Sequence, residues 1–186
     1  MSEKLQFIKH LCGIDEAGRG PFAGPMVVAG CELLENIDEL NDSKKLSEKK
    51  RELLFEEIIK KSKYHIVFSS ARQIDELGIS ACLKNSIQEI IQNIKSDEYL
   101  MDGNTSFGFD IKHLIKADAK ITNVSAASIL AKVSRDRYMI NLNEKYPQYQ
   151  FDKHKGYGTK LHTQILKDFG LSDEHRKSFR IKALES

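Results

Sequence analysis

The amino-acid sequence predicts a single α/β domain in which a mixed β-sheet is flanked by helices. Strand-like runs come first, helical periodicity then alternates with further short strands, and neither a repeat nor a low-complexity linker interrupts the 186 residues. A chain of this length matches one compact domain with its own core. We therefore expect one domain over residues 1–186, with residues 170–186 packed on it as a C-terminal tail.

The first elements are predicted to be two neighbouring strands at residues 10–16 and 26–34. The segment GRGPFAGP separates them, and its glycine and proline content indicates a turn. Apolar residues from 46 to 59 then recur at helical spacing, whereas residues 64–69 alternate as a strand does. The chain thus changes from strand to helix and back to strand.

The clearest amphipathic helix is predicted over residues 79–94, where isoleucine and leucine recur every three or four positions. A short strand at 99–102 follows and ends at a Gly-Asn turn. A further helix is expected from about 124 to 143, and a last one from about 159 to 169, which the next glycine would end. Between them, residues 146–158 are predicted to form a polar and aromatic loop.

Composition limits the class of protein. The sequence has 40% hydrophobic and 30% charged residues, with no signal peptide and no apolar run long enough for a membrane span. Cys12, Cys31 and Cys82 are an odd number without CxxC spacing, which predicts neither a disulfide framework nor a thiolate zinc site. The formal net charge of +2 does not by itself indicate a nucleic-acid-binding protein. We expect a cytoplasmic protein that binds no membrane.

Carboxylates at the ends of two predicted strands give the first indication of chemistry. Asp15 and Glu16 end the first strand and lead directly into AGRGP, unlike the other Asp-Glu pairs, which lie in ordinary helical or loop settings. Asp102 ends the strand YLMD after apolar neighbours, and a carboxylate at that depth requires a cation. Asp118, in KADAK, would on its own be interpreted as a loop aspartate.

If these four carboxylates meet at one end of the sheet, they form an all-oxygen site suited to Mg²⁺ or Mn²⁺. Cations are needed because four neighbouring negative charges repel one another. Two such ions can support in-line displacement at phosphorus. Spacing in the sequence does not establish that the four residues converge.

Several segments in order resemble the ribonuclease HII family. GIDEAGRGPFAGP and DSKKLS match its N-terminal signature, and the match continues through MDGN, KADA, SAASILAKVSRDR, HKGYGTKLH and HRKSF. The resemblance covers nearly the whole chain and implies the ribonuclease H-like fold. It also implies a metal-dependent endonuclease that hydrolyses the RNA strand of RNA–DNA hybrids by two-metal-ion hydrolysis. Such an enzyme cuts 5′ of ribonucleotides embedded in duplex DNA, leaving 5′-phosphate and 3′-hydroxyl ends.

The resemblance also implies roles for individual residues. Catalysis and binding of Mn²⁺ or Mg²⁺ are implied for Asp15, Glu16, Asp102 and Asp118. Contact with the nucleic acid is implied for Gly18, Arg19, Gly20, Lys44, Lys45 and Tyr157. Ala117 stands where the family commonly has glycine. This departure affects only the expected fine geometry near Asp118.

Two of these assignments keep an alternative when the residues are considered alone. Tyr157 is either a loop tyrosine that covers apolar surface or an aromatic that stacks on a base or sugar, and the resemblance favours stacking. Lys44 and Lys45 either steer the nucleic-acid backbone or belong to a solvated surface.

Arg135 and Asp136 are expected to form a structural ion pair on a helix. The histidines His154, His162 and His175 lack metal-ligand spacing and are expected at loop or helix surfaces.

Two other functions share some of these features. Ribonuclease HIII shares much of the catalytic signature but carries an additional N-terminal domain, and the roughly ten residues before the first strand are too few for it, so we expect a ribonuclease HII. A non-catalytic nucleic-acid-binding module would use the basic and aromatic residues alone, and the carboxylates argue against it. We expect a monomer, with a sliding clamp left open as a partner.

Overall fold

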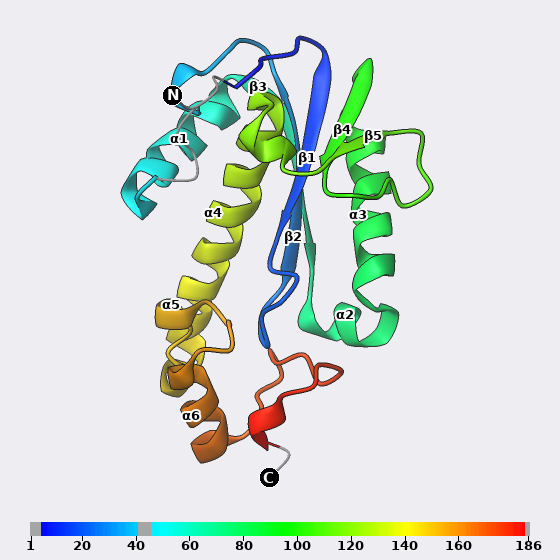
Figure 1. The fold of residues 1–186 in the computed structure, drawn as a ribbon. Coiled ribbons are helices and arrows are strands. Elements are labelled where there is room, and N and C mark those ends of the chain that lie inside the picture. The colour runs from blue at the N-terminus through cyan, green and yellow to red at the C-terminus, as the bar shows by residue number, and fades with distance from the viewer. Residues whose placement is uncertain (1–4, 41–45, 185–186) are drawn as a thin grey trace.

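The structure is a computed structural model that describes residues 5–40 and 46–184. One mixed sheet runs through it with the strand order β3-β2-β1-β4-β5 (Figure 1). The strands β1, β2 and β3 pair antiparallel, whereas β4 pairs parallel to β1 and β5 parallel to β4. The bounds of the strands are β1 (Leu11–Ala17), β2 (Met26–Leu33), β3 (Ser62–Ser69), β4 (Glu98–Asp102) and β5 (Lys112–Leu114).

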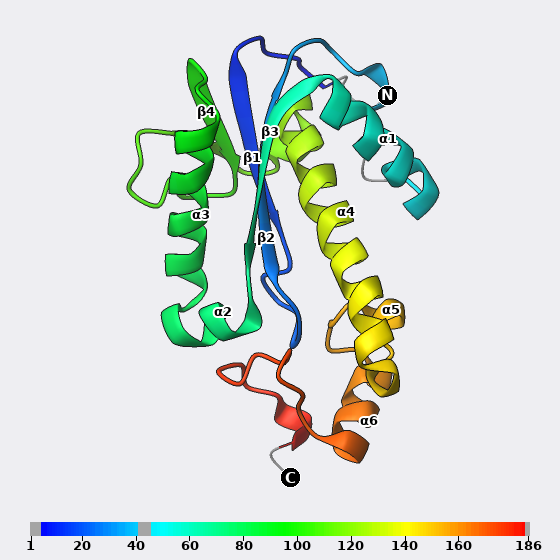
Figure 2. The same ribbon diagram turned by 180° about the vertical axis from the view of Figure 1, so that it is seen from behind.

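Helices cover both faces of the sheet, as Figures 1 and 2 show from opposite sides. The helices α1 (Glu48–Lys60) and α4 (Thr122–Lys145) pack on one face, and α2 (Ala71–Leu77) and α3 (Ile79–Asn93) lie on the other. The far end of α4 carries α5 (Phe151–His154) and α6 (Lys160–Phe169). Short 3-10 turns occur at η2 (Ala117–Ala119), η3 (Pro147–Tyr149) and η4 (Lys182–Leu184).

Alternation along β1 and β2 divides the core between these two helical layers. Val27 and Ala29 of β2 join the cluster formed with α1 and α4, whereas Val28 joins the cluster formed with α3. In β1, Ile14 packs toward α3, while Leu11 belongs to a cluster with residues at the start of α4. Burial of both faces explains why Leu11–Ile14 of β1 and Met26–Cys31 of β2 contain no alternating polar side chains.

The expected mixed sheet flanked by helices is confirmed, and so are the predicted strand pair and the helices near 79–94, 124–143 and 159–169. The prediction of a polar and aromatic loop over 146–158 is wrong for Pro147–Tyr149 and Phe151–His154, where η3 and α5 form. Within residues 5–40 and 46–184, no helix combines the length and apolar character that a bilayer crossing requires. The cysteines are free thiols, and all three are buried.

The beginning of α4 lies directly against β1 at Gly13. A methyl group added to this glycine would lie 2.4 Å from the carbonyl carbon of Asn123 and 2.5 Å from the amide nitrogen of Val124. Asn123 also fixes the position of the helix, since its side-chain amide donates to the carbonyl of Leu11 at 2.9 Å. Only glycine permits this approach of backbone to backbone.

We predict that Gly13→Ala destabilises the protein by about 1–3 kcal/mol or more, because the obstructing atoms belong to a helix backbone that cannot rotate away. Urea denaturation followed by circular dichroism measures the loss. Gly20→Ala is the matched control, since an added methyl group there meets no atom within 4 Å. A stability of Gly13→Ala equal to that of the control would show that α4 does not rest on β1 in this way.

Candidate active site

The carboxylates predicted at two strand ends lie on neighbouring strands. In the parallel ladder Ile14 pairs with Met101, so Asp15 and Asp102 follow side by side where β1 and β4 end. Both side chains are on the α4 face of the sheet. This follows because Ile14 and Met101, one residue earlier, pack together in the cluster on the α3 face.

Asp15 is buried, with only 6% of its surface exposed. Burial, followed by the negative charge of Glu16, raises its pKa to about 8, and Asp102 contributes in the same direction. Hydrogen bonds from the Ser128 side chain and from the N–H of Glu16, the latter at 2.8 Å, oppose this rise. Ser128 belongs to α4, so the helix that packs on β1 also supplies a partner for the carboxylate.

Glu16 lies partly buried beside Asp15. Burial is the largest influence on its carboxyl and raises its pKa, although Arg19 forms an ion pair with it at 3.2 Å. Its Oε2 atom is buried and has no hydrogen-bond partner among the described residues. An orphaned carboxylate oxygen next to a second buried carboxylate is costly unless a cation completes the site.

Asp118 lies in the turn η2, one residue after Ala117. Asp102 accepts a hydrogen bond from the N–H of Ala117 at 2.7 Å, which ties the end of β4 to the residue before Asp118. Ala117 itself is fully buried with Leu11, Leu100 and Val124. The methyl group that replaces the family's common glycine is therefore accommodated in the core.

The donor set fits a hard divalent cation. It consists of carboxylate oxygens, and burial raises the pKa of both Asp15 and Glu16. Among the residues that the structure describes, no three His, Cys, Asp or Glu side chains are gathered closely enough to form a ready metal-binding group. The negative charges of Glu16 and Asp102 raise the pKa of Asp15, and that of Asp102 also raises the pKa of Glu16. That these residues bind one cation together remains a prediction.

The GRG loop, residues 18–20, follows β1 and begins one residue after the carboxylates. Gly18 has a φ of 89°, and a methyl group there would lie 2.2 Å from Nε of Arg135. Gly20 is exposed, with open space around it. Gly18 is therefore required by the fold of the loop, whereas Gly20 leaves room on its outer side.

The predicted ion pair between Arg135 and Asp136 is wrong. Arg135 is fully buried and donates to the backbone carbonyls of Pro25 at 2.9 Å and Ala23 at 3.1 Å. Asp136 instead pairs with Lys132 one turn earlier, at 2.6 Å. The arginine supports the segment between β1 and β2 because its guanidinium can donate to several carbonyls at once.

Tyr157 is 41% exposed, and its ring lies 5.3 Å from the guanidinium carbon of Arg135. Its carbonyl accepts a hydrogen bond from Nδ1 of His162 at 2.9 Å. The tyrosine is thus held by its backbone while part of its ring stays accessible. Lys44 and Lys45 lie outside the described residues, so their predicted contacts stay predictions.

The expectation that the three histidines lie at surfaces is wrong, because His154, His162 and His175 are all buried. Burial lowers the pKa of His162 and of His175 to about 4, so both imidazoles are neutral near pH 7. The N–H of Ser172 donates to Nδ1 of His175, which leaves Nε2 of His175 to donate to Nε2 of His162 at 3.0 Å. This chain of neutral rings ends at Tyr157 and orders its loop.

Sequence reasoning missed Ser128, Arg135 and Arg176 as parts of this region. Each lies in a segment that carried the family resemblance, SAASILAKVSRDR or HRKSF. The signal was present in the motifs, but the contacts depend on which distant backbone atoms the fold brings to these side chains.

The mixed sheet and its flanking helices define a ribonuclease H-like fold, with carboxylates at adjoining strand ends. The solved PCNA:RNase HII complex from Archaeoglobus fulgidus contains a chain that is 31% identical, with a TM-score of 0.80 and coverage of 92% of this chain and 96% of that one. The ribonuclease H2 from Pyrococcus horikoshii OT3 is 27% identical, with a TM-score of 0.73 and coverage of 94% and 95%. A Bst-RNase HIII structure in complex with Mn²⁺ is 16% identical, with a TM-score of 0.64 and coverage of 87% and 64%, and supports the fold alone.

Sequence comparison gives the family. The model of the family described as Ribonuclease HII matches residues 12–182. A ribonuclease HII of Aliarcobacter butzleri is 67% identical over 180 residues, which cover 95% of this chain and 94% of that protein. One of Campylobacter jejuni is 54% identical over 178 residues, or 95% and 93%. The chain belongs to the ribonuclease HII family, whose members are divalent-metal-dependent endoribonucleases that act on the RNA of RNA–DNA hybrids.

The pKa of Asp15 predicts how the stability of the metal-free protein depends on pH. Folding raises this pKa from its ordinary value of about 3.9 to about 8, so the folded chain keeps a proton that the unfolded chain has released. That contribution to stability is fully present below about pH 4 and is lost as the pH rises through about 8. Between pH 6.5 and 8.5 wild type should lose about 1–2 kcal/mol more than Asp15→Asn.

The measurement is urea unfolding in the presence of EDTA at both pH values. The buried His162 and His175, whose pKa is about 4 in the folded protein, take up protons near pH 6.5 only in the unfolded chain. This contribution is the same in both proteins and cancels when wild type is compared with Asp15→Asn. Parallel pH dependence in wild type and Asp15→Asn would contradict a protonated, buried Asp15.

Proposed function

We propose that this protein cuts the RNA strand on the 5′ side of ribonucleotides, in RNA–DNA hybrids and at single ribonucleotides embedded in duplex DNA. Asp15, Glu16, Asp102 and Asp118 would hold two divalent ions, Mg²⁺ or Mn²⁺. The proposal rests on the buried Asp15 and the partly buried Glu16 near the end of β1, which are coupled to Asp102 and lie one residue before the GRG loop. When bound, the ions supply an activated water and stabilise the departing 3′ oxygen.

Recognition of the ribose is proposed for the GRG loop. A protein distinguishes RNA from DNA through the 2′-hydroxyl or the shape of the helix, and the open space outside Gly20 admits a sugar close to the backbone. The Arg19 side chain is 57% exposed, and its partner Glu16 lies at the carboxylate site. Arg19 can therefore contact a phosphate next to the reacting bond.

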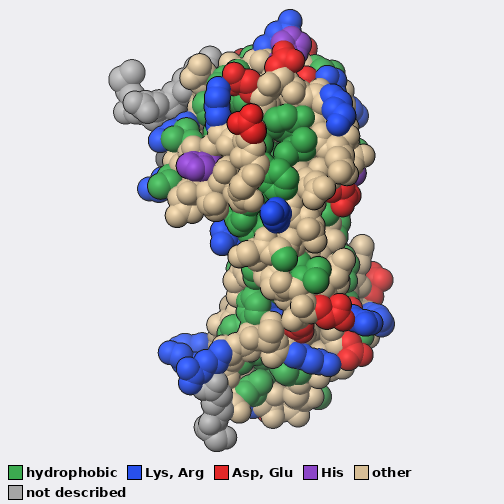
Figure 3. Space-filling model, turned by 90° about the vertical axis from the view of Figure 1, so that its right-hand side faces the viewer, with side chains coloured by type: hydrophobic (Ala, Val, Ile, Leu, Met, Phe, Trp, Pro, Cys, Tyr) green, Lys and Arg blue, Asp and Glu red, His purple; other side chains and the backbone are tan. Residues whose placement is uncertain are grey.

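The accessible ring of Tyr157 is proposed to stack on the neighbouring sugar or base. Its backbone is fixed by His162, which reduces the ordering that stacking would cost. Viewed from the α3 side, the molecule narrows between an upper and a lower part, and both parts carry Lys and Arg side chains with Asp and Glu side chains among them (Figure 3). The basic side chains on either side of this narrowing can contact the phosphates of a nucleic-acid duplex.

We further propose that the protein acts as a monomer in the cytoplasm, where its three free thiols stay reduced. A sliding clamp is a candidate partner, because the Archaeoglobus fulgidus relative is solved in complex with PCNA. Co-elution of the purified chain with its own clamp on size exclusion would support that partner, and separate elution at micromolar concentration would argue against it.

Asp102→Asn is predicted to fold and to bind hybrid duplex, but to lose cleavage by several orders of magnitude. The amide oxygen still accepts the hydrogen bond of Ala117, while the negative charge toward the metal is removed. Single-turnover cleavage at millimolar Mg²⁺ is the measurement. Asp38→Asn is the control, since Asp38 is exposed and accepts a hydrogen bond from Asn36. Equal losses in both variants would contradict the assignment.

A duplex with one ribonucleotide should be cut 5′ of that ribonucleotide, leaving a 3′-hydroxyl on the DNA and a 5′-phosphate on the ribose-bearing product. The 2′-hydroxyl is recognised and is not the nucleophile, so no cyclic phosphate forms. Arg19→Ala, Gly20→Val and Tyr157→Ala should each reduce the rate, the last by an amount equivalent to about 1–3 kcal/mol.

End-group analysis of the products tests this mechanism. A 2′,3′-cyclic phosphate, or cleavage of all-DNA duplex at a comparable rate, would overturn it. Gly20→Val is the sharpest of the three variants, since a Cβ atom at Gly20 meets no other atom of the protein within 4 Å. A loss of activity in Gly20→Val would therefore show that the substrate occupies the space outside Gly20.

A further inference from the structure

Arg176 is fully buried and binds the GRG loop from its inner side. Its Nη2 donates to the carbonyl of Gly18 at 2.6 Å, and its Nη1 donates to the carbonyl of Arg19 at 2.9 Å. Nε and Nη2 also donate to the carbonyl of Gly24, at 3.1 and 3.0 Å. One guanidinium thus connects the exit of β1 with the residues that lead into β2.

The charge of this guanidinium is not neutralised by an ion pair, since none is formed by Arg176 in the described part of the chain. Burial, and then the charge of Arg135, lower its pKa to about 10, which still leaves it protonated near pH 7. A buried charge held by carbonyl groups and by the ring of Phe179, whose centroid lies 5.1 Å from the guanidinium carbon, is a costly way to stabilise a loop, and an apolar side chain would cost less. This cost indicates a role beyond stability.

The geometry of the peptide bond gives that role. In a trans peptide the carbonyl and the N–H of the next residue point in opposite directions, and no cis peptide is present in the described residues. The carbonyl of Gly18 shares a plane with the N–H of Arg19, and the carbonyl of Arg19 shares one with the N–H of Gly20. Because Arg176 holds both carbonyls inward, both N–H groups point outward.

Those N–H groups are available to a ligand. Arg19 and Gly20 are exposed, and in residues 5–40 and 46–184 neither N–H donates a hydrogen bond. Two adjacent outward donors above a buried positive charge suit an anionic or hydroxyl oxygen.

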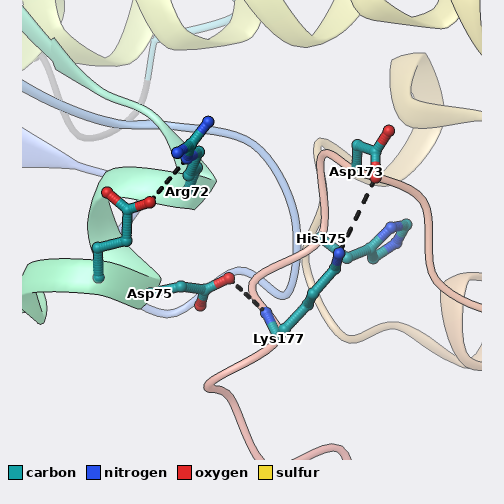
Figure 4. A pocket seen from close by; sticks show the side chains of 6 residues that line it. Arg72, Asp75, Asp173, His175 and Lys177 are labelled. Carbon is teal, nitrogen blue, oxygen red and sulfur yellow. Dashed lines mark hydrogen bonds and ion pairs between the residues drawn. The ribbon is translucent and has the colours of Figure 1, made fainter.

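The surrounding contacts keep Arg176 in place. Its own N–H donates to the carbonyl of Phe22 at 2.8 Å. The next two residues donate their N–H groups to Asp75 of α2, Lys177 at 2.8 Å and Ser178 at 2.9 Å. Figure 4 shows Asp75 directed at Lys177 across a pocket that is also lined by Arg72, Asp173 and His175.

We propose that Arg176 is a positioning residue for ribose recognition: by binding the carbonyls of Gly18 and Arg19 it presents the N–H groups of Arg19 and Gly20 to the ribonucleotide. This inference rests on the proposed function. Arg176 itself contacts no substrate. It acts through the backbone of the loop.

Arg176→Lys tests the proposal, because lysine keeps the positive charge but cannot donate to the three carbonyls in a planar fork. The dissociation constants of a one-ribonucleotide duplex and of the same duplex in all-DNA form are measured by fluorescence anisotropy in EDTA, where nothing is cut. We expect Arg176→Lys to reduce the preference for the ribonucleotide at least fivefold. A purely structural loss would weaken both duplexes in equal proportion and leave the preference unchanged.

Arg137→Lys is the matched control, since Arg137 lies on α4 but pairs with Glu52 and Glu56, away from the loop. It should keep the full preference. Should Arg176→Lys fail to fold, ¹⁵N-labelled wild type is titrated with both duplexes. The amide signals of Arg19 and Gly20 should then shift when the ribonucleotide duplex is added, and these shifts should differ from those that the all-DNA duplex causes.

The outcomes separate the two proposals. An unchanged preference in folded Arg176→Lys, or amide signals that respond identically to both duplexes, overturns the positioning role. A wild type that neither prefers nor cuts the ribonucleotide duplex overturns the proposed function instead.

Discussion

Parallel pairing between β1 and β4 places two strand ends side by side, and the candidate site depends on this register. The pairing of Ile14 with Met101 sends Asp15 and Asp102 to the same edge and the same face of the sheet. Backbone contact between α4 and Gly13 then buries that face, so the carboxylates lose water and the pKa of Asp15 rises. Because the sheet holds these carboxylates close together and away from water, their charged forms are unfavourable, and a divalent cation can offset this cost.

The loop between β1 and β2 extends the same arrangement toward the nucleic acid. It begins one residue after the carboxylate-bearing end of β1 and is held from within by two buried arginines, Arg135 and Arg176. The neutral histidines that end at Tyr157 hold the neighbouring aromatic in a comparable way. The residues proposed for catalysis and the loop proposed for substrate recognition thus lie at the same end of β1. Side chains from distant parts of the sequence hold the recognition residues in place.

The sequence was sufficient for the long elements and for the carboxylates at strand ends. Helix α3 carries a periodic apolar stripe, and Asp102 follows an apolar strand, so local patterns determine both. The three-residue strand β5 and the seven-residue helix α2 were not predicted, because elements so short depend on tertiary contacts. Burial of Arg176 was equally inaccessible, since arginine is usually exposed and its carbonyl partners come from the opposite end of the chain.

Calorimetric titration of the purified protein with Mn²⁺ at pH 7.5 determines whether Asp15 belongs to a divalent metal site. Because the pKa of Asp15 lies near 8, metal binding should release part of a proton. The observed heat should therefore change with the ionisation enthalpy of the buffer in wild type, and this dependence should be lost in Asp15→Asn together with most of the affinity. Equal Mn²⁺ affinity and equal buffer dependence in the two proteins would contradict the account.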